Sequence, residues 1–209
     1  MALNPWLEIS VNDYINHMSS PEVRQYQMIK ECFKTALYRY NPQTIFVPGC
    51  TVGNGFEHID WQKIKKVVAL DINNEYLNVL RSSYPEKEKL QIVNDDLLNF
   101  TADGSNFDLI FAALLFEYIN VQSSLKKIKE LMHKTSTLFS ILQLPSKVHS
   151  KVTRTKYKSL EKLNSLMHLV DVNEFHQEII RTGLYIKRSE QKTLKSGKSF
   201  SLIEAGLAT

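Results

Sequence analysis

The sequence contains little cysteine and no long hydrophobic run. Only two of its 209 residues are cysteines, Cys32 and Cys50, so the chain lacks both a disulfide framework and a cysteine-based metal site. The histidines show no metal-ligand spacing, and no metal is expected. No apolar run approaches the ~20 residues that span a membrane. Residues 1–9 also lack the charged start and apolar stretch of a signal peptide. We therefore expect a cytoplasmic protein without a membrane partner.

The composition is that of one globular domain. At 24.2 kDa, with 43% hydrophobic and 23% charged residues, residues 1–209 suit a single domain with a substantial core. The net charge of +4 comes largely from residues 147–162 and 187–198, where basic residues are mixed with Glu161 and Glu190. Such segments are typical of solvated faces rather than of a groove that follows phosphates. The charge therefore does not favour nucleic acid as a partner, and the oligomeric state stays open.

Strand and helix patterns alternate along most of the chain. Helical patterns cover residues 74–83 and 123–133. Five apolar runs, rich in residues that favour strands, cover residues 44–47, 67–70, 90–93, 107–113 and 137–142. Near-continuous apolar strands separated by helices predict a parallel sheet with helices on both faces. Residues 184–194 and 199–207 flank a short glycine turn, which predicts a C-terminal antiparallel hairpin. The fold class is therefore α/β, Rossmann-like and doubly wound.

Two segments stand outside this alternation. Near the N-terminus, residues 11–18 are predicted to form an extra helix, and Ser20-Pro21-Glu22 resembles the start of the helix over residues 21–40. Residues 146–169, after the fifth strand, begin polar and basic and end in a short amphipathic pattern over residues 160–167. This insertion has the size of a pocket cover.

A glycine-spaced turn follows the first predicted strand. Residues 48–55 contain Gly49, Gly53 and Gly55. Glycine reaches backbone angles that other residues avoid, and it leaves no side chain between the main chain and a ligand. Asp71 lies about 20 residues beyond the turn, at the end of the second strand, where an acidic residue commonly binds a ribose. Together these features predict a nucleotide-binding site.

The turn resembles the first motif of the class I S-adenosylmethionine-dependent methyltransferases, acid-x-Gly-x-Gly-x-Gly, and the wider resemblance covers most of the chain from residue 44 onward. Two positions depart from the motif: Val47 stands where the acid is usual, and Thr51 replaces the middle glycine. The first departure removes a carboxylate near the methionine ammonium group, which then needs a carbonyl or another partner. The family implies S-adenosylmethionine as the cofactor and a seven-stranded sheet in the order 3-2-1-4-5-7-6 with an antiparallel last strand.

Later strand ends resemble further motifs of this family. Asp71 occupies the second motif, in which the acid accepts hydrogen bonds from both ribose hydroxyls. Its alternative role is to cap the helix over residues 74–83. Residues 107–118 resemble the fourth motif, at the strand end that faces the methyl group, and residues 138–145 fit the fifth strand. All these strand ends meet at one crevice of such a sheet.

The third motif contains two adjacent acids. The resemblance favours Asp96 over Asp95 as the partner of the adenine amino group, with Leu97 supplying a backbone amide, and one of the two acids should face solvent. The residues that the resemblance predicts to bind the cofactor are Gly49, Cys50, Thr51, Gly53, Asp71, Ile72, Asp96, Leu97, Ala113, Tyr118, Tyr14 and Met18.

Candidate groups for the chemistry come from two segments. Tyr14, His17 and Met18 share one helical face by their spacing. Because related enzymes often close the cofactor pocket with an N-terminal helix, residues 1–20 are predicted to form a lid. Glu117, Tyr14 and His17 are candidates for a general base, and the sequence does not choose among them. A purely structural role is the alternative for each.

The acceptor is predicted from absences. The Asn-Pro-Pro-Tyr type of signature, which amino-methylating nucleic-acid enzymes carry after the fourth strand, is replaced by Ala-Ala-Leu-Leu at residues 112–115. The insertion at residues 146–169 suits a small-molecule acceptor with an apolar part, enclosed together with residues 11–18. Three alternatives remain: a nicotinamide-dependent oxidoreductase, a nucleic-acid methyltransferase and a cofactor-binding protein without catalytic activity.

Overall fold

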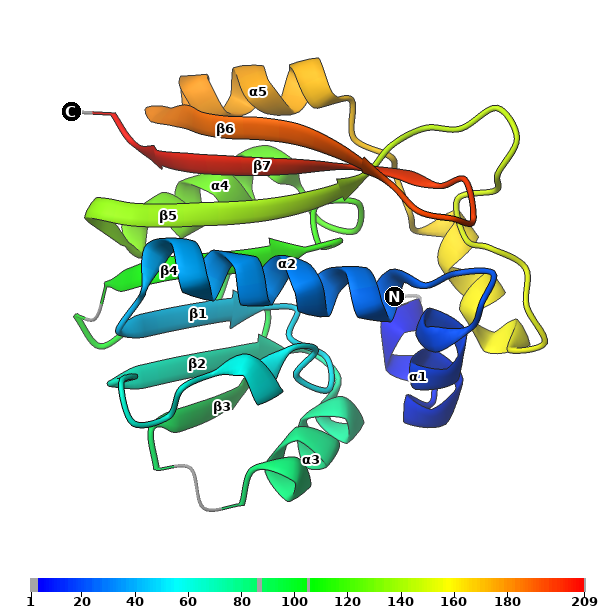
Figure 1. The fold of residues 1–209 in the computed structure, drawn as a ribbon, viewed down its shortest axis with the longest axis horizontal. Coiled ribbons are helices and arrows are strands. Elements are labelled where there is room, and N and C mark those ends of the chain that lie inside the picture. The colour runs from blue at the N-terminus through cyan, green and yellow to red at the C-terminus, as the bar shows by residue number, and fades with distance from the viewer. Residues whose placement is uncertain (1–3, 86–87, 105, 209) are drawn as a thin grey trace.

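One seven-stranded sheet organises the chain. The computed structural model describes residues 4–85, 88–104 and 106–208, and its strands lie in the order β3-β2-β1-β4-β5-β7-β6 (Figure 1). The strands are β1 (Thr44–Pro48), β2 (Lys66–Asp71), β3 (Leu90–Asn94), β4 (Phe107–Ala113), β5 (Met132–Gln143), β6 (Leu184–Thr193) and β7 (Ser199–Leu207). The first five strands are parallel, and β7 runs antiparallel to both β5 and β6. The predicted fold and strand order are confirmed.

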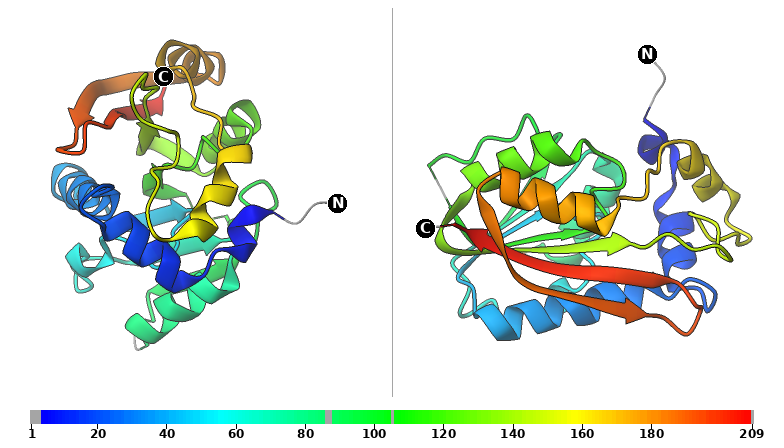
Figure 2. Two further views of the ribbon diagram at one scale, coloured as in Figure 1. Left: turned by 90° about the vertical axis from the view of Figure 1, so that its right-hand side faces the viewer. Right: turned by 90° about the horizontal axis from the view of Figure 1, so that it is seen from above.

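Helices cover both faces of the sheet, as Figure 2 shows from two sides. On one face α2 (Gln25–Tyr40) and α3 (Asn74–Ser83) pack against side chains of β1, β2 and β4. On the other face α4 (Val121–Glu130) and α5 (Val172–Arg181) bury apolar residues against the alternate side chains of the same strands. Because both faces are covered, the central strands are apolar throughout rather than alternating.

The segment before α2 differs from its predicted form. Ser20 ends α1 (Val11–Ser19) instead of beginning the next helix, and its carbonyl accepts the backbone amides of Val23 and Arg24 in a tight turn. Arg24 then adopts a left-handed conformation, and α2 begins at Gln25. Val23 is fully buried, so tertiary packing outweighs the local signal for a helix start at Pro21.

The boundary between α4 and β5 is also earlier than predicted. The helix ends at Glu130, and Met132 pairs with Phe107 in the sheet. The last two residues of the helical pattern predicted over 123–133 therefore belong to β5. A register shift follows, within which Ser136 donates its hydroxyl to the Phe107 carbonyl. The polar residues 133–136 form this irregular stretch of β5, which explains why the sequence did not indicate a strand there.

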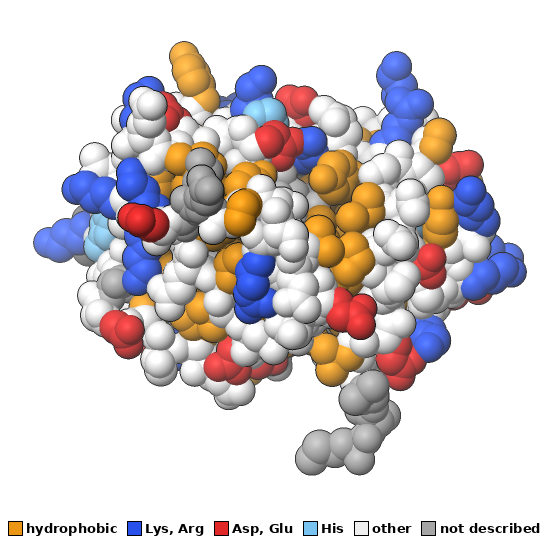
Figure 3. All heavy atoms as spheres, turned by 90° about the horizontal axis from the view of Figure 1, so that it is seen from below, with side chains coloured by type: hydrophobic (Ala, Val, Ile, Leu, Met, Phe, Trp, Pro, Cys, Tyr) orange, Lys and Arg blue, Asp and Glu red, His pale blue; other side chains and the backbone are white. Residues whose placement is uncertain are grey.

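Three short segments gather beyond the carboxyl ends of the strands (Figures 1 and 2). They are η1 (Pro5–Glu8), α1 and η3 (Lys158–Ser165), and the last is a 3₁₀ helix within the insertion 146–169. Ser159 bonds to Asp13, and Lys162 pairs with Glu8, so the insertion is tied to the N-terminal segment. Figure 3 shows charges of both signs on the face seen from below. Within the part of the chain that is described, no helix is both long and apolar enough to cross a membrane.

Candidate active site

The glycine turn leaves β1 through a series of left-handed residues. Gly49, Gly53 and Gly55 have φ angles of 66°, 82° and 97°, and the backbone amide of Cys50 donates to the Leu70 carbonyl over 3.1 Å. Thr51, which replaces the expected middle glycine, also has a positive φ of 50°. A β-branched residue in this region stores backbone strain, and such strain is commonly found at functional sites. Instead of a long helix, only the short η2 (Phe56–His58) follows before β2.

A large cavity opens beside this turn at the carboxyl ends of the strands. Its empty volume is about 1370 Å³, part of it open to solvent. The cavity extends from the glycine turn and the acids at or just after the ends of β2 and β3 to Leu160, Leu163 and Met167 of the insertion. The predicted site residues that line it are Gly49, Cys50, Thr51, Asp71, Ile72, Asp96, Leu97, Ala113, Tyr118, Tyr14, His17 and Met18. Gly53 and Glu117 lie outside the lining.

Asp71 anchors the end of the turn. One oxygen of its carboxylate accepts the backbone amide of Thr51 over 2.9 Å, and the other accepts that of Asn73 over 2.8 Å. Burial raises the pKa of Asp71 to about 6, although the amides favour the charged form. The helix α3 is capped by Asn73 and not by Asp71. Asp71 is therefore free of the alternative capping role, and its remaining lone pairs are available at the cavity.

Both acids of the third motif line the cavity. Asp95 is half-buried, and its Oδ1 accepts the amide of Asp96 over 2.7 Å. Asp96 is exposed and accepts the amide of Leu98 over 2.8 Å. Leu97 is buried in the apolar cluster that includes Val68 and Leu70 of β2. The geometry brings both carboxylates to the same edge and does not select one of them.

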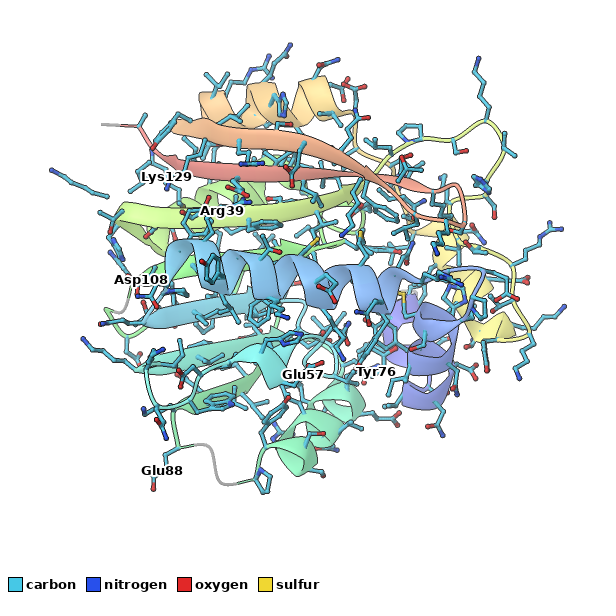
Figure 4. The ribbon with its side chains drawn as sticks, in the orientation of Figure 1. Arg39, Glu57, Tyr76, Glu88, Asp108 and Lys129 are labelled. Atoms are coloured by element: carbon cyan, nitrogen blue, oxygen red, sulfur yellow. The ribbon has the colours of Figure 1, made fainter. Side chains whose placement is uncertain are left out.

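Tyr14 joins the N-terminal helix to the glycine turn. Its hydroxyl accepts hydrogen bonds from Asn54 Nδ2 over 2.7 Å and from Thr51 Oγ1 over 3.1 Å. Its ring packs against that of Tyr76 of α3, which is labelled in Figure 4, with 5.2 Å between ring centroids. Burial raises the pKa of Tyr14 to about 12. Its phenol is therefore protonated near neutral pH and is better suited to holding the helix than to accepting a proton.

Replacing Tyr14 by phenylalanine is expected to lower the free energy of unfolding by about 1–3 kcal/mol. The change leaves the buried amide of Asn54 without an acceptor, and Asn54 Oδ1 already lacks a partner. Hydrogen exchange of the α1 amides should accelerate more than that of the sheet. Tyr38→Phe is the matched control, because Tyr38 is 92% exposed. Equal stability of the two variants would contradict this role.

The N-terminal segment adds residues that the sequence did not indicate. Trp6 lines the cavity and packs edge-on against Tyr118 and Tyr14, with centroid distances of 5.1 and 6.3 Å. Its carbonyl accepts the side-chain amide of Asn73 over 2.8 Å. Asn4 caps this 3₁₀ turn and also lines the cavity. An isolated tryptophan beside an Asn-Pro pair was the only available signal.

A second cluster of polar side chains lines the cavity near the end of β5. Gln25 donates to Gln143 over 3.3 Å, and both side chains are buried. Lys198, from the turn between β6 and β7, donates to the Lys151 carbonyl over 2.7 Å. His17 Nδ1 lies 3.0 Å from the Thr155 hydroxyl, and burial lowers the pKa of His17 to about 4. This cluster brings together four parts of the chain that are distant in the sequence. Only His17 was among the predicted site residues.

Glu117 is buried and lies outside the cavity lining. Its side chain is 1% exposed, and its Oε1 accepts the backbone amide of Gln143 over 2.6 Å. Its carbonyl accepts the amide of His168, which fixes the end of the insertion. Burial raises the pKa of Glu117 to about 7, and its Oε2 has no hydrogen-bond partner. Since the side chain does not line the cavity, this geometry favours a role in joining β5 to the insertion.

One departure from the family's first motif lies within strand β1. Val47 is buried and lines the cavity at the position where a carboxylate is usual. A ligand ammonium group in that region would need a carbonyl oxygen or another partner. Within the described ranges, no group of three or more His, Cys, Asp or Glu side chains is arranged to hold a metal ion.

Comparisons with known proteins address the family and the fold. Residues 47–140 match a family model described as a methyltransferase domain, and no curated protein matches the sequence significantly. The magnesium protoporphyrin IX methyltransferase ChlM from Synechocystis PCC 6803, with bound S-adenosylmethionine, is similar with a TM-score of 0.69, 11% identity and 99% of each chain covered.

Two further solved structures are similar. N-methyltransferase NodS from Bradyrhizobium japonicum WM9, in complex with S-adenosyl-L-homocysteine, has a TM-score of 0.68 and 11% identity, covering 91% of this chain and 89% of that one. The [4+2]-cyclase SpnF has a TM-score of 0.67 and 7% identity, covering 88% and 82%. At these identities the structural likeness is one of fold. The predicted fold is confirmed, and the predicted resemblance to the methyltransferases is confirmed through residues 47–140, which match a methyltransferase domain.

Proposed function

We propose that this protein transfers the methyl group of S-adenosylmethionine to a small molecule with an apolar part. One observation carries the proposal: a single cavity joins the glycine turn and Asp71 to an apolar region beneath the insertion. Leu160, Leu163 and Met167 of that region are buried and line the cavity. A cover of this kind suits a compact acceptor better than a nucleic-acid strand.

The adenosine end of the cofactor would lie along β2 and β3. Asp71 would accept the ribose hydroxyls, and the Asp95–Asp96 turn with Leu97 would surround the adenine, as the family motifs imply. These residues meet at the carboxyl edge because β1, β2 and β3 are neighbours in one parallel sheet. The backbone of Gly49 and Cys50 would approach the methionine part.

S-adenosylmethionine supplies a methyl group already activated on sulfonium, so alignment and the exclusion of water would be the main contributions of the protein. Trp6, Tyr14 and Tyr118 would cover the site from the N-terminal side. None of the three predicted base candidates is well placed near neutral pH. Tyr14 stays protonated, His17 is a weak base with a lowered pKa, and Glu117 lies off the cavity. This favours an acceptor whose nucleophile needs none of the three as a base.

The proposal is tested by calorimetric titration with S-adenosylmethionine and S-adenosylhomocysteine, followed by transfer of a radioactive methyl group to a panel of small amines, phenols and acids. We expect both cofactor forms to bind and at least one acceptor to be labelled. NAD serves as the control ligand. Binding of NAD without binding of S-adenosylmethionine would overturn the proposal in favour of an oxidoreductase.

Cofactor binding is expected to weaken as the pH falls through about 6. The ribose hydroxyls donate to the charged carboxylate, and burial raises the pKa of Asp71 to about 6, so at lower pH the carboxyl must first lose a proton. The affinity for S-adenosylhomocysteine at about pH 5 should be about tenfold below that at about pH 8. The Asp71→Asn variant should lose this dependence. A flat profile in the unmodified protein would contradict the assignment.

A cofactor-binding protein without methyl transfer is the second candidate. Val47 favours it, because this apolar residue replaces the acid expected near the methionine ammonium group. The same fold also occurs in a [4+2]-cyclase. Tight binding of S-adenosylmethionine with no labelled product across the acceptor panel would support this alternative.

A further inference from the structure

Lys198 is a buried cation at the far side of the cavity from Asp71. Asp71 ends β2, and Lys198 directly precedes β7. These strands are four positions apart in the sheet, or about 19 Å at the usual spacing between strands. Lys198 is 4% exposed and lines the cavity. Its Nζ donates to the Lys151 carbonyl over 2.7 Å and lies 3.5 Å from Gln143 Oε1.

The partners of Lys198 are neutral. None of the ion pairs formed within residues 4–85, 88–104 and 106–208 includes it. Lysine is almost never buried without a charged partner, because removing an ammonium group from water is costly. Burial accordingly lowers the pKa of Lys198 to about 8. A carbonyl and an amide oxygen orient the ammonium group without neutralising it, so the cavity contains an uncompensated positive charge at this end.

A purely structural role does not require this lysine. The Lys151 carbonyl also accepts a hydrogen bond from Gln143 Nε2 over 2.8 Å, so it is satisfied without Lys198. The hairpin turn is closed by main-chain hydrogen bonds between Leu194 and residues 197 and 198. The lysine therefore adds a cost to the folded state that a methionine of similar length would avoid.

The charges of the cavity are separated along the sheet. Asp71, Asp95 and Asp96 lie at the end assigned to the adenosine, whereas Lys198 lies beside His17, which the positive charge of Lys198 helps to keep neutral. Leu163 and Met167 of the insertion supply an apolar wall to the same cavity. A ligand that complements this end has an anionic group and an apolar body.

We propose that Lys198 binds a carboxylate of the methyl acceptor, and that the acceptors of this protein are small organic acids with an apolar body. This assignment rests on the proposed function, because it places the acceptor in the part of the cavity that the cofactor leaves free. Gln25 and Gln143 would offer amide groups beside the same carboxylate. The charge-assisted hydrogen bond would orient the acid relative to the methyl donor.

The test uses matched acids and amides as probes. Benzoate with benzamide, 3-phenylpropanoate with 3-phenylpropanamide, and indole-3-acetate with indole-3-acetamide are titrated by calorimetry into the protein saturated with S-adenosylhomocysteine. We expect at least one acid to bind about tenfold or more tightly than its amide. Lys198→Met should abolish that preference, and Lys198→Arg should retain part of it. Lys195→Met is the matched control, since Lys195 is exposed in the same turn and does not line the cavity.

Two further readouts separate the possible failures. Lys198→Met should bind S-adenosylhomocysteine as the unmodified protein does, with a thermal midpoint no lower than that of the unmodified protein in the absence of ligand. Binding of S-adenosylhomocysteine with no acid preferred over its amide would overturn the role of Lys198 and leave the proposed function standing. A lower midpoint with parallel loss of acid and amide binding would identify a structural lysine and also overturn it. Failure of the unmodified protein to bind S-adenosylhomocysteine would instead reject the proposed function itself.

Discussion

Replacing Asp71 by alanine is expected to weaken binding of S-adenosylhomocysteine by about 1.5–3 kcal/mol, which is tenfold to more than a hundredfold. The buried carboxylate would accept hydrogen bonds from both ribose hydroxyls, and bonds to a charged group are among the strongest that a protein offers. Water cannot easily replace it, because Asp71 is 7% exposed. Isothermal titration calorimetry at about pH 8 measures the effect with the carboxylate fully charged.

The alanine variant also removes acceptors for the backbone amides of Thr51 and Asn73. Part of its effect on affinity therefore comes from loss of support for the turn. Asp71→Asn keeps the shape and one carbonyl oxygen, and comparing the two variants separates charge from loop support. Asp95→Ala and Asp96→Ala are informative controls, because the structure brings both side chains to the same cavity. A folded Asp71→Ala protein with unchanged affinity would refute the ribose assignment.

Most residues predicted for the cofactor side line one cavity in the structure, because they lie at or just after strand ends. Gly49, Asp71 and Leu97 each lie at or just after the carboxyl end of an apolar strand, and a parallel sheet brings such ends together whatever the intervening helices do. Fold and strand order could be predicted for the same reason. Local pattern, strand ends and family motifs all agreed there. The individual cofactor contacts stay predictions.

The residues proposed to bind the acceptor could not be predicted in this way. Gln25 of α2 and Lys198 of the β6–β7 turn both approach Gln143 of β5, and each residue alone has an ordinary local environment in the sequence. Trp6 reaches the cavity only because its turn is held against Asn73. These clusters form through contacts between residues that are distant in the sequence. Neither hydrophobic periodicity nor turn-residue patterns predict such contacts. The same limitation moved the start of α2 from Pro21 to Gln25, where burial of Val23 determined the path.

The two departures from the glycine motif also have different physical meanings in the structure. Thr51 accepts a strained backbone conformation, and its hydroxyl donates to Tyr14 of the N-terminal helix. A glycine could relieve the strain but could not make that bond. Val47 makes no comparable contact and contributes an apolar wall. We therefore interpret Thr51 as part of the attachment of the N-terminal helix, and Val47 as the departure that would affect cofactor affinity.

Gly53→Ala is expected to cause the largest loss of stability among single changes in the turn. Gly53 has a φ of 82°, and a Cβ there would lie 2.5 Å from Leu80 Cδ1 and 3.3 Å from the ring of Phe56. A non-glycine residue in this conformation costs about 1–2 kcal/mol. Overpacking a buried core adds about 1–3 kcal/mol, and Leu80 is fully buried. Urea denaturation should show a combined loss of about 2–5 kcal/mol.

Gly104→Ala separates these two contributions. Gly104 has a φ of 70°, and a Cβ there would meet no atom within 4 Å, so its variant reports the backbone cost alone. If both variants lose the same stability, the packing of α3 against the turn is not what requires glycine at position 53. A much larger loss for Gly53→Ala would show that this glycine of the motif serves the close approach of Leu80 and Phe56. The structure places Gly53 outside the cavity, so its requirement for glycine would then be explained without any contact to the cofactor.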